Sequence, residues 1–202
     1  MLRIVPSQSG TAAKSYFDRA LAPGDYYLDG EELAGSWGGR AAELLGLSGE
    51  VTREAFHALC DNHHPTSGEQ LTPRMNAKRR VGYDFNFHCP KGVSAVFALT
   101  RDDRILHAFR RSVEETMREL EQDSETRVRT DGRFESRTTS NMVWGEFVHF
   151  TSRPVDGTPD PHLHAHCFAM NATWDVEESR WKAADFGSIK RDASVPIDKF
   201  RE

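Results

Sequence analysis

The clearest pattern of hydrophobic and polar positions lies between residues 80 and 88. Apolar residues occupy every second position there, and the positions between them are small or polar. The two sets are Val81, Tyr83, Phe85 and Phe87 on one side and Gly82, Asp84, Asn86 and His88 on the other. Successive side chains of a strand point to opposite faces, so this pattern predicts a half-buried strand with an unusual polar face.

Helical spacing dominates two other parts of the chain. Residues 102–122 form the longest predicted helix, with apolar residues three or four positions apart, and a shorter helix is predicted to start at Pro90. Near the N-terminus, shorter helices are predicted at 11–21, 38–47 and 52–60, with Ser9 or Thr11 and then Thr52 as caps. Residues 61–78 show no period and are rich in turn formers, which predicts a long exposed loop.

The second half of the chain is predicted to consist mainly of strands. Residues 126–129 and 133–138 flank Asp131-Gly132, which indicates a hairpin, and further strands are expected at 142–152 and 162–172. The stretch WDVEESRW is expected to turn between two strand ends. With no βαβ rhythm and no glycine-rich phosphate loop, the chain is predicted to be one α+β domain over residues 1–202, a central antiparallel β-sheet flanked by helices.

Composition adds limits on where such a domain works. The 202 residues carry only three scattered cysteines, which argues against a disulfide framework. No run approaches the roughly 18 apolar residues of a membrane span, and MLRIVPSQSG lacks the features of a signal peptide. We therefore expect a cytoplasmic protein without membrane insertion.

The net charge of -5 does not suggest nucleic-acid binding, but the charge is unevenly distributed. Acidic residues concentrate in the N-terminal quarter, whereas residues 73–91 and the predicted hairpin are locally basic. The arginines considered as phosphate contacts are Arg79, Arg80, Arg127, Arg129, Arg133 and Arg137. The alternative for each is an ordinary solvated surface arginine.

The stretch DPHLHAH supplies the strongest candidate chemistry. On a strand, His162, His164 and His166 project to the same side, with Cα atoms roughly 7 Å apart between successive members. If the strand at 142–152 pairs antiparallel with this one, His149 meets them and completes a metal site. The alternative is a set of polar residues on a solvated face. His162, beside Pro161, is expected to contact either a metal ligand or the substrate rather than to coordinate the ion.

Asp84 is the second unusual residue. A carboxylate in mid-strand between Tyr83 and Phe85 is costly unless it has a strong partner. The free N–H of a metal-bound imidazole is one such partner, and a nearby arginine is the alternative.

Four segments taken together resemble a known family. They are SWGGRAAELLGLSGEV, YDFNFHCPKGVS, HFTSR and DPHLHAHCFAMN, in this order after an N-terminal tyrosine. From Met1 to about Asp192 the chain resembles conjugative relaxases of the TrwC/TraI (MobF) family, which are three-histidine (HUH) endonucleases. The resemblance implies the palm-like relaxase fold and the nicking of single-stranded DNA at a transfer origin, with the protein left attached to the 5′ end.

The resemblance also implies roles for individual residues. His149, His164 and His166 would hold a divalent ion, either Mg²⁺, Mn²⁺ or Zn²⁺, which would neutralise charge on the scissile phosphate. The remaining roles it implies are Tyr16 as the first nucleophile, Tyr26 or Tyr27 as a second one, and Asp84 as the support of a ligand histidine and activator of the tyrosine. The residues we expect to contact DNA are Arg79, Arg80, Arg127, Arg129, Arg153 and His162. A phenol has an ordinary pKa near 10, so a tyrosine nucleophile needs such activation. The expected partner is single-stranded origin DNA, with other relaxosome proteins as further partners, and a monomer is expected.

Two departures from the family pattern stand out. The linker between His149 and His164 carries extra residues around VDGTP, and Ala165 replaces a threonine. We expect residues 1–202 to lack the C-terminal part of the family's relaxase domain and any helicase domain. The alternatives left open are a rolling-circle replication initiator, a non-catalytic nucleic-acid-binding module with a structural ion, and a metal-dependent oxygenase.

Overall fold

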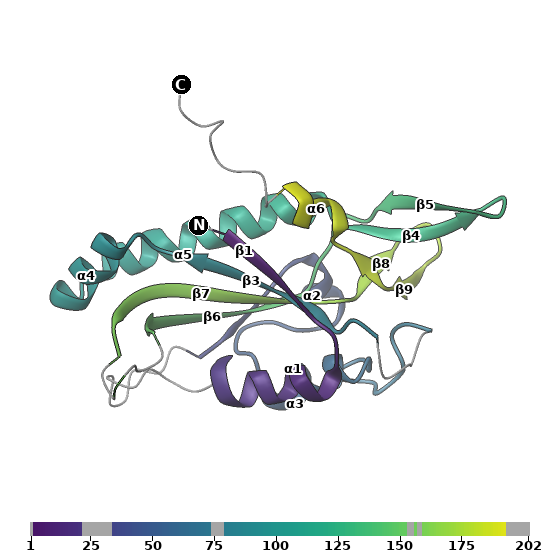
Figure 1. Cartoon of the computed structure of the whole chain (residues 1–202). Helices are drawn as coiled ribbons and strands as arrows, with labels where there is room; N and C mark the ends of the chain where they lie inside the picture. The colour runs from purple at the N-terminus through teal and green to yellow at the C-terminus, as the bar shows by residue number, and fades with distance from the viewer. Residues whose placement is uncertain (1, 22–33, 74–78, 153–155, 157–158, 193–202) are drawn as a thin grey trace, which may run out of the picture.

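A five-stranded antiparallel sheet forms the centre of the computed structural model, which describes residues 2–21, 34–73, 79–152, 156 and 159–192 (Figure 1). The strand order is β1-β3-β7-β6-β2. The strands are β1 (Leu2–Ser7), β3 (Gly82–His88), β7 (Pro161–Met170), β6 (Trp144–Thr151) and β2 (Ser36–Gly38). The predicted α+β class with a central antiparallel sheet is therefore confirmed.

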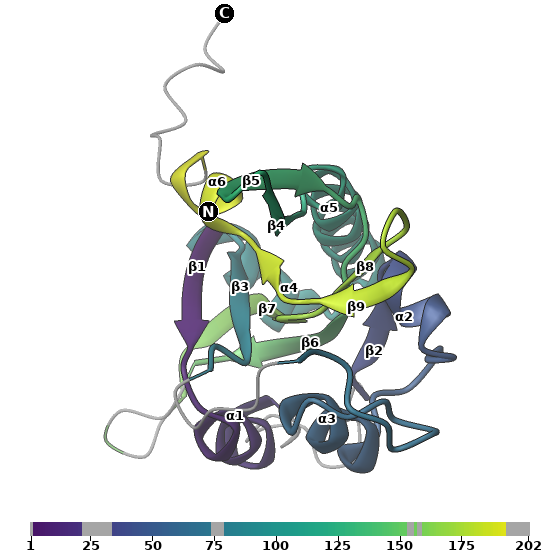
Figure 2. The same ribbon diagram turned by 90° about the vertical axis from the view of Figure 1, so that its right-hand side faces the viewer.

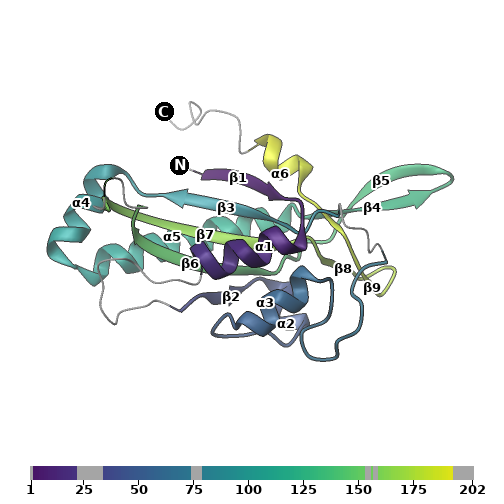
Figure 3. The same ribbon diagram turned by 60° about the horizontal axis from the view of Figure 1, so that its bottom comes forward.

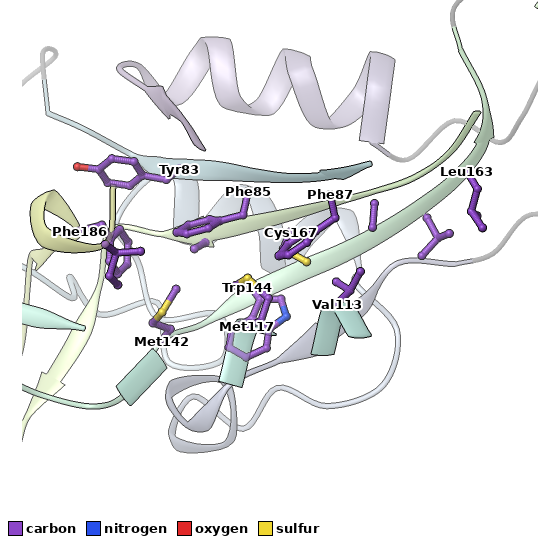
Figure 4. Packing of buried hydrophobic residues seen from close by; sticks show 14 of the residues in the cluster. Tyr83, Phe85, Phe87, Val113, Met117, Met142, Trp144, Leu163, Cys167 and Phe186 are labelled. Atoms are coloured by element: carbon purple, nitrogen blue, oxygen red, sulfur yellow. The ribbon is translucent and has the colours of Figure 1, made fainter. Parts of the chain in front are cut away.

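One face of the sheet packs against the long helix α5 (Asp103–Gln122), with α4 (Lys91–Thr100) beside its start (Figure 1). The Asp102 side chain caps α5 by accepting a hydrogen bond from the Arg104 amide. The alternating apolar side of β3 faces this layer, where Phe85 packs with Val113 and Met117 of α5 (Figure 4). The apolar half of the 80–88 pattern thus identifies one core.

The opposite face is covered by α1 (Gly10–Tyr16), the π-helical turn η1 (Phe17–Leu21), α2 (Arg40–Leu44) and α3 (Arg53–Cys60). Helices α1 and α3 lie below the sheet in Figure 1, and α1 crosses in front of it in Figure 3. Phe17 and Phe56 stack there, and Phe56 also contacts Phe168 of β7. Because these helices cover the polar side of β3 as well, Asp84 and Asn86 are only 6% and 8% exposed. The expectation of a half-buried strand is wrong, since β3 is enclosed on both faces.

A smaller three-stranded sheet extends from one end of the molecule (Figure 1), the end that faces the viewer in Figure 2. It consists of β10 (Ala184–Asp185), β4 (Glu125–Thr130) and β5 (Arg133–Thr138), and β4 and β5 form the hairpin predicted from Asp131-Gly132. The turn expected in WDVEESRW joins β8 (Thr173–Asp175) and β9 (Arg180–Lys182). Helix α6 (Gly187–Asp192) ends the described part of the chain.

No helix in the described ranges combines the length and the apolar character that crossing a bilayer requires. The longest, α5, carries charged residues along one side.

Candidate metal and tyrosine site

Strand register brings the predicted histidines together. In the antiparallel pairs, His149 of β6 lies opposite His164 of β7, and His164 lies opposite His88 of β3. His166 lies two residues further along β7, on the same face. The predicted meeting of His149 with the DPHLHAH strand is therefore confirmed.

The spacing of the three imidazoles is close to what a shared ion requires. Their ring centres are 5.3 Å apart for His149 and His164, 5.2 Å for His164 and His166, and 5.7 Å for His149 and His166. An ion about 2.1 Å from one nitrogen of each ring would separate the ring centres by roughly 5 to 5.6 Å. In the described part of the chain, no three His, Cys, Asp or Glu side chains could hold a metal ion as they stand, so binding would require the rings to rotate.

Hydrogen bonds to the ring nitrogens favour the tautomer that binds metals. Nδ1 of His164 lies 2.8 Å from the carbonyl oxygen of His162, and Nδ1 of His166 lies 2.9 Å from Oδ2 of Asp84. Both oxygens accept a hydrogen bond from the protonated Nδ1, which leaves the Nε2 lone pair of each ring for an ion. Burial, together with the neighbouring imidazoles, lowers the pKa of His164 to about 3, so this ring is neutral at ordinary pH. The residues present therefore fit a divalent ion.

Tyr16 meets the histidines through Asp84. Its hydroxyl donates a hydrogen bond of 2.6 Å to Oδ2 of Asp84 and lies 3.0 Å from Nδ1 of His166. Tyr16 is the last residue of α1, a helix capped at its start by the Ser9 side chain, so helix length determines where the phenol lies. Asp84 thus pairs with a tyrosine and a histidine, and within the described ranges no arginine is its partner.

His162 and His88 extend the histidine group to the end of the sheet. The His162 ring stacks on His164 with ring centres 4.6 Å apart, and its Nε2 lies 3.2 Å from Nδ1 of His88. Burial and neighbouring charged groups lower the pKa of both rings. His88 was visible in the sequence only as one polar position of β3, and its proximity to the site depends on pairing between β3 and β7.

The basic residues are widely dispersed. Half-buried Arg79 donates hydrogen bonds to the carbonyl oxygens of Leu59 and Cys60 at the end of α3, while exposed Arg80 contacts Tyr83. Arg79 therefore stabilises the end of α3, a role that the sequence did not indicate. Its assignment as a DNA contact stays a prediction.

The hairpin β4–β5 lies at the other end of the molecule from α4, whereas His88 and His164 lie beside the start of α4 (Figure 1). Arg127 and Arg129 are exposed there, and Arg127 pairs with Asp185 at 2.8 Å. Arg137 instead pairs with Asp175, so it does not belong to the expected basic face. Tyr26, Tyr27 and Arg153 lie outside the described residues, and their assignments remain predictions.

A family comparison identifies this arrangement. The model of the TrwC relaxase family matches residues 10–198. The chain belongs to the TrwC relaxase family. The match includes the tyrosine helix, β3 and both histidine strands, which are the elements that form the site.

Curated relatives of this TrwC relaxase chain are much longer proteins. The chain is 35% identical over 180 residues to the multifunctional conjugation protein TraI of Escherichia coli, and 34% identical over 175 residues to that of strain K12. These alignments cover 88% and 86% of the chain but only 10% and 9% of the relatives.

Solved TrwC relaxases share the fold. A metal-bound conjugative relaxase TrwC in complex with oriT DNA has a TM-score of 0.79 and 31% identity, over 95% of this chain and 63% of its own. TrwC with a 27-mer DNA comprising the recognition hairpin and the cleavage site has a TM-score of 0.76 and 29% identity, over 95% and 62%. A copper-bound TrwC complex with oriT DNA is also similar, with a TM-score of 0.79 and 32% identity over 95% and 64%. The chain thus spans slightly less than two thirds of these structures.

Proposed function

We propose that this chain is the catalytic part of a conjugative relaxase, which nicks one strand of a transfer-origin DNA and becomes attached to its 5′ end through Tyr16. The observation that carries the proposal is the placement of the Tyr16 hydroxyl 2.6 Å from Asp84 and 3.0 Å from His166. A phenol held against a carboxylate, beside three clustered imidazoles, has the arrangement of an activated nucleophile. Membership of the TrwC relaxase family favours this function over the rolling-circle initiator and the oxygenase.

The reaction is a transesterification in which Tyr16 supplies the attacking oxygen. Its proton passes to Asp84, the bond between Oη and phosphorus forms, and the bond between phosphorus and the 3′ oxygen breaks. The electron pair leaves with the 3′ oxygen, which takes up a proton and becomes a hydroxyl. One phosphodiester is replaced by another, so the strand is rejoined when the step is reversed.

Asp84 also acts on His166. By accepting a hydrogen bond of 2.9 Å from Nδ1–H, it fixes the ring tautomer and orientation, so that Nε2 faces the group of histidines. His149, His164 and His166 would hold a divalent ion whose chemical contribution is to neutralise charge on the non-bridging phosphate oxygens. Three protein ligands are typical of catalytic ions and four of structural ones, which favours an enzyme over a binding module.

The distance between the hairpin and the histidines suggests two separate DNA contacts. Arg129 lies over the ring of Phe134, which is 71% exposed, at the far end of the molecule from the cleavage site. Exposed arginines beside an exposed aromatic ring suit contact with a DNA backbone. We assign Arg127 and Arg129 to a DNA segment remote from the nick, with His162 next to the scissile phosphate.

The experiment is a cleavage assay on single-stranded oligonucleotides from the chain's own plasmid origin, labelled at either end, with Mg²⁺ or Mn²⁺. We expect a denaturant-resistant protein adduct that carries only the 3′-end label, a released fragment with a 3′ hydroxyl, and no reaction in EDTA. A scrambled oligonucleotide of equal length is the control. Cleavage without an adduct, or no cleavage of the cognate strand, would contradict the proposal.

A further inference from the structure

A second feature of the site is a pocket of about 420 Å³ on the side of Tyr16 that faces the sheet edge. Tyr16, Asp84 and Asn86 line it together with Arg3 and Val5 of the edge strand β1. This volume falls within the roughly 300 to 1,000 Å³ typical of small-ligand pockets and is sufficient for one nucleotide. The nucleophile therefore borders both the group of histidines and this pocket.

Strand register explains why polar side chains gather in the pocket. Arg3 lies opposite Asn86, which lies opposite His166, so these three residues form one row across β1, β3 and β7. Residues paired in this way point to the same face of a sheet. The guanidinium of Arg3 and the side-chain amide of Asn86 thus lie in one row with His166, a predicted metal ligand. The neighbouring residue on each strand points to the other face of the sheet and packs into the core there.

The geometry of displacement at phosphorus indicates which nucleotide would enter. The attacking and leaving oxygens lie on opposite sides of phosphorus, so the strand that departs with its 3′ oxygen points away from Tyr16. The nucleotide that keeps the phosphate stays bound through its 5′ oxygen and ends covalently attached to Tyr16. A pocket with Tyr16 in its wall lies on the side of the retained nucleotide.

We propose that this pocket binds the first nucleotide downstream of the nick, with Asn86 contacting the base and Arg3 contacting the next phosphate. This rests on the proposed function, because the direction of attack defines downstream. Asn86 donates one hydrogen bond of 3.2 Å to the carbonyl oxygen of Asp84, which uses one of the two amide protons. The pocket therefore determines base preference at the downstream position, separately from contacts that recognise the upstream strand.

Binding measurements on the uncleaving Tyr16→Phe protein test the base contact. In the presence of the divalent ion, we expect an abasic site just downstream of the nick to weaken binding of the DNA by Tyr16→Phe about tenfold. This is the size of the loss of one bidentate contact to a base. Adding Asn86→Ala should weaken binding to intact DNA similarly and make the downstream abasic site nearly without effect. An abasic site just upstream should be equally harmful in both proteins.

Arg3 provides an independent test, since it is exposed and its replacement leaves the core unchanged. Arg3→Ala should weaken binding several-fold and remove the sensitivity to a methylphosphonate at the second phosphate downstream. Arg104→Ala, which removes an exposed charge from the other face of the sheet, is the matched control and should keep that sensitivity. If Asn86→Ala does not fold, the comparison of Arg3→Ala with Arg104→Ala alone tests the proposal.

The proposal is overturned if Tyr16→Phe binds abasic and intact downstream DNA equally. It is also overturned if the Asn86 and Arg3 variants keep the full penalties of the modified DNA. Either result with normal adduct formation by the wild-type chain leaves the proposed function standing. Absence of any wild-type adduct removes the proposed function itself.

Discussion

At the scale of single residues, the site depends on one carboxylate with two partners. Asp84 accepts hydrogen bonds from the Tyr16 hydroxyl and the His166 ring, so it links the proposed nucleophile to a predicted metal ligand. The carboxylate is buried in the middle of β3, where desolvation is costly. The hydrogen bonds that both partners donate to it offset this cost.

Asp84→Asn should therefore slow adduct formation by at least about 100-fold, because an amide cannot take the tyrosine proton or fix the His166 tautomer. Single-turnover kinetics on origin DNA measure this rate. The affinity of Asp84→Asn for DNA should change less than about threefold. The matched control is Asp18→Asn, which alters an exposed carboxylate just after α1 and should react at nearly the wild-type rate. A rate for Asp84→Asn within fivefold of wild type would exclude Asp84 as the proton acceptor.

Several residue contacts could be predicted from the sequence, whereas others needed the register of distant strands. The alternation around Asp84 and the spacing of His164 and His166 are local patterns, and both predicted the correct face. His88 and Asn86 gave no such signal, because a polar residue on a strand becomes part of a site only when a partner strand aligns with it.

At the scale of elements, a buried acid links the hairpin region to the turn after β7. Asp175 of β8 has a side chain only 1% exposed and pairs with Arg137 of β5 at 2.9 Å and with Lys182 of β9 at 3.4 Å. Burial acts to raise the pKa of this carboxyl, but the Glu178 amide and the two cations hold the pKa below its usual value. The carboxylate is therefore stabilised in the folded chain.

Asp175→Asn should lower the free energy of unfolding by about 2 kcal/mol at pH 7. This is less than the roughly 3 to 5 kcal/mol for a fully buried pair, because the cations keep Glu177 and Glu178 as partners. A carboxyl with a lowered folded pKa contributes stability above its unfolded pKa near 3.9 and loses it as the pH falls through the folded value. Urea titrations should thus give a constant difference from pH 7 to about 5 that shrinks below pH 4. A difference that persists unchanged to pH 3 would contradict this account.

The second glycine of SWGGR lies in the connection between β2 and α2, and the backbone there requires a glycine. Gly39 has a φ of 95°, and a Cβ there would lie 2.1 Å from the carbonyl oxygen of Met142. Gly46 has a φ of 69° but nothing within 4 Å of its Cβ position.

Gly39→Ala should consequently cost at least about 2 kcal/mol more than Gly46→Ala, for which backbone strain alone predicts about 1 kcal/mol. Chemical denaturation of both variants measures the difference. Equal losses would mean that the contact with Met142 relaxes without cost.

Element prediction succeeded where the pattern was long or carried a specific signal. The long helix α5, the hairpin at Asp131-Gly132 and the cap at Thr52 were all predicted and are present. The edge strands β1 and β2 were missed, since LRIVPS includes a proline and β2 is only three residues long. Both depend on pairing with β3 and β6, which local propensity does not encode.

At the scale of the whole molecule, one sheet separates the face that α5 covers from the face that carries the group of histidines. Helix α1 carries Tyr16 onto the second face, while the hairpin β4–β5 extends from the far end (Figure 1). The net charge of -5 gave no indication of the exposed arginines on the hairpin, because total charge does not show where charged residues lie. The fold class could be predicted from the sequence, but the separation between the group of histidines and the hairpin could not.

The central claim is that Tyr16 becomes covalently bound to the 5′ phosphate of the nicked strand. The most direct measurement is peptide mapping by mass spectrometry of the adduct formed with a short origin oligonucleotide. We predict a nucleotide phosphate mass on the peptide containing Tyr16, and no adduct from Tyr16→Phe in the first round of cleavage. A nucleotide on another residue, or an undiminished adduct from Tyr16→Phe, would contradict the account.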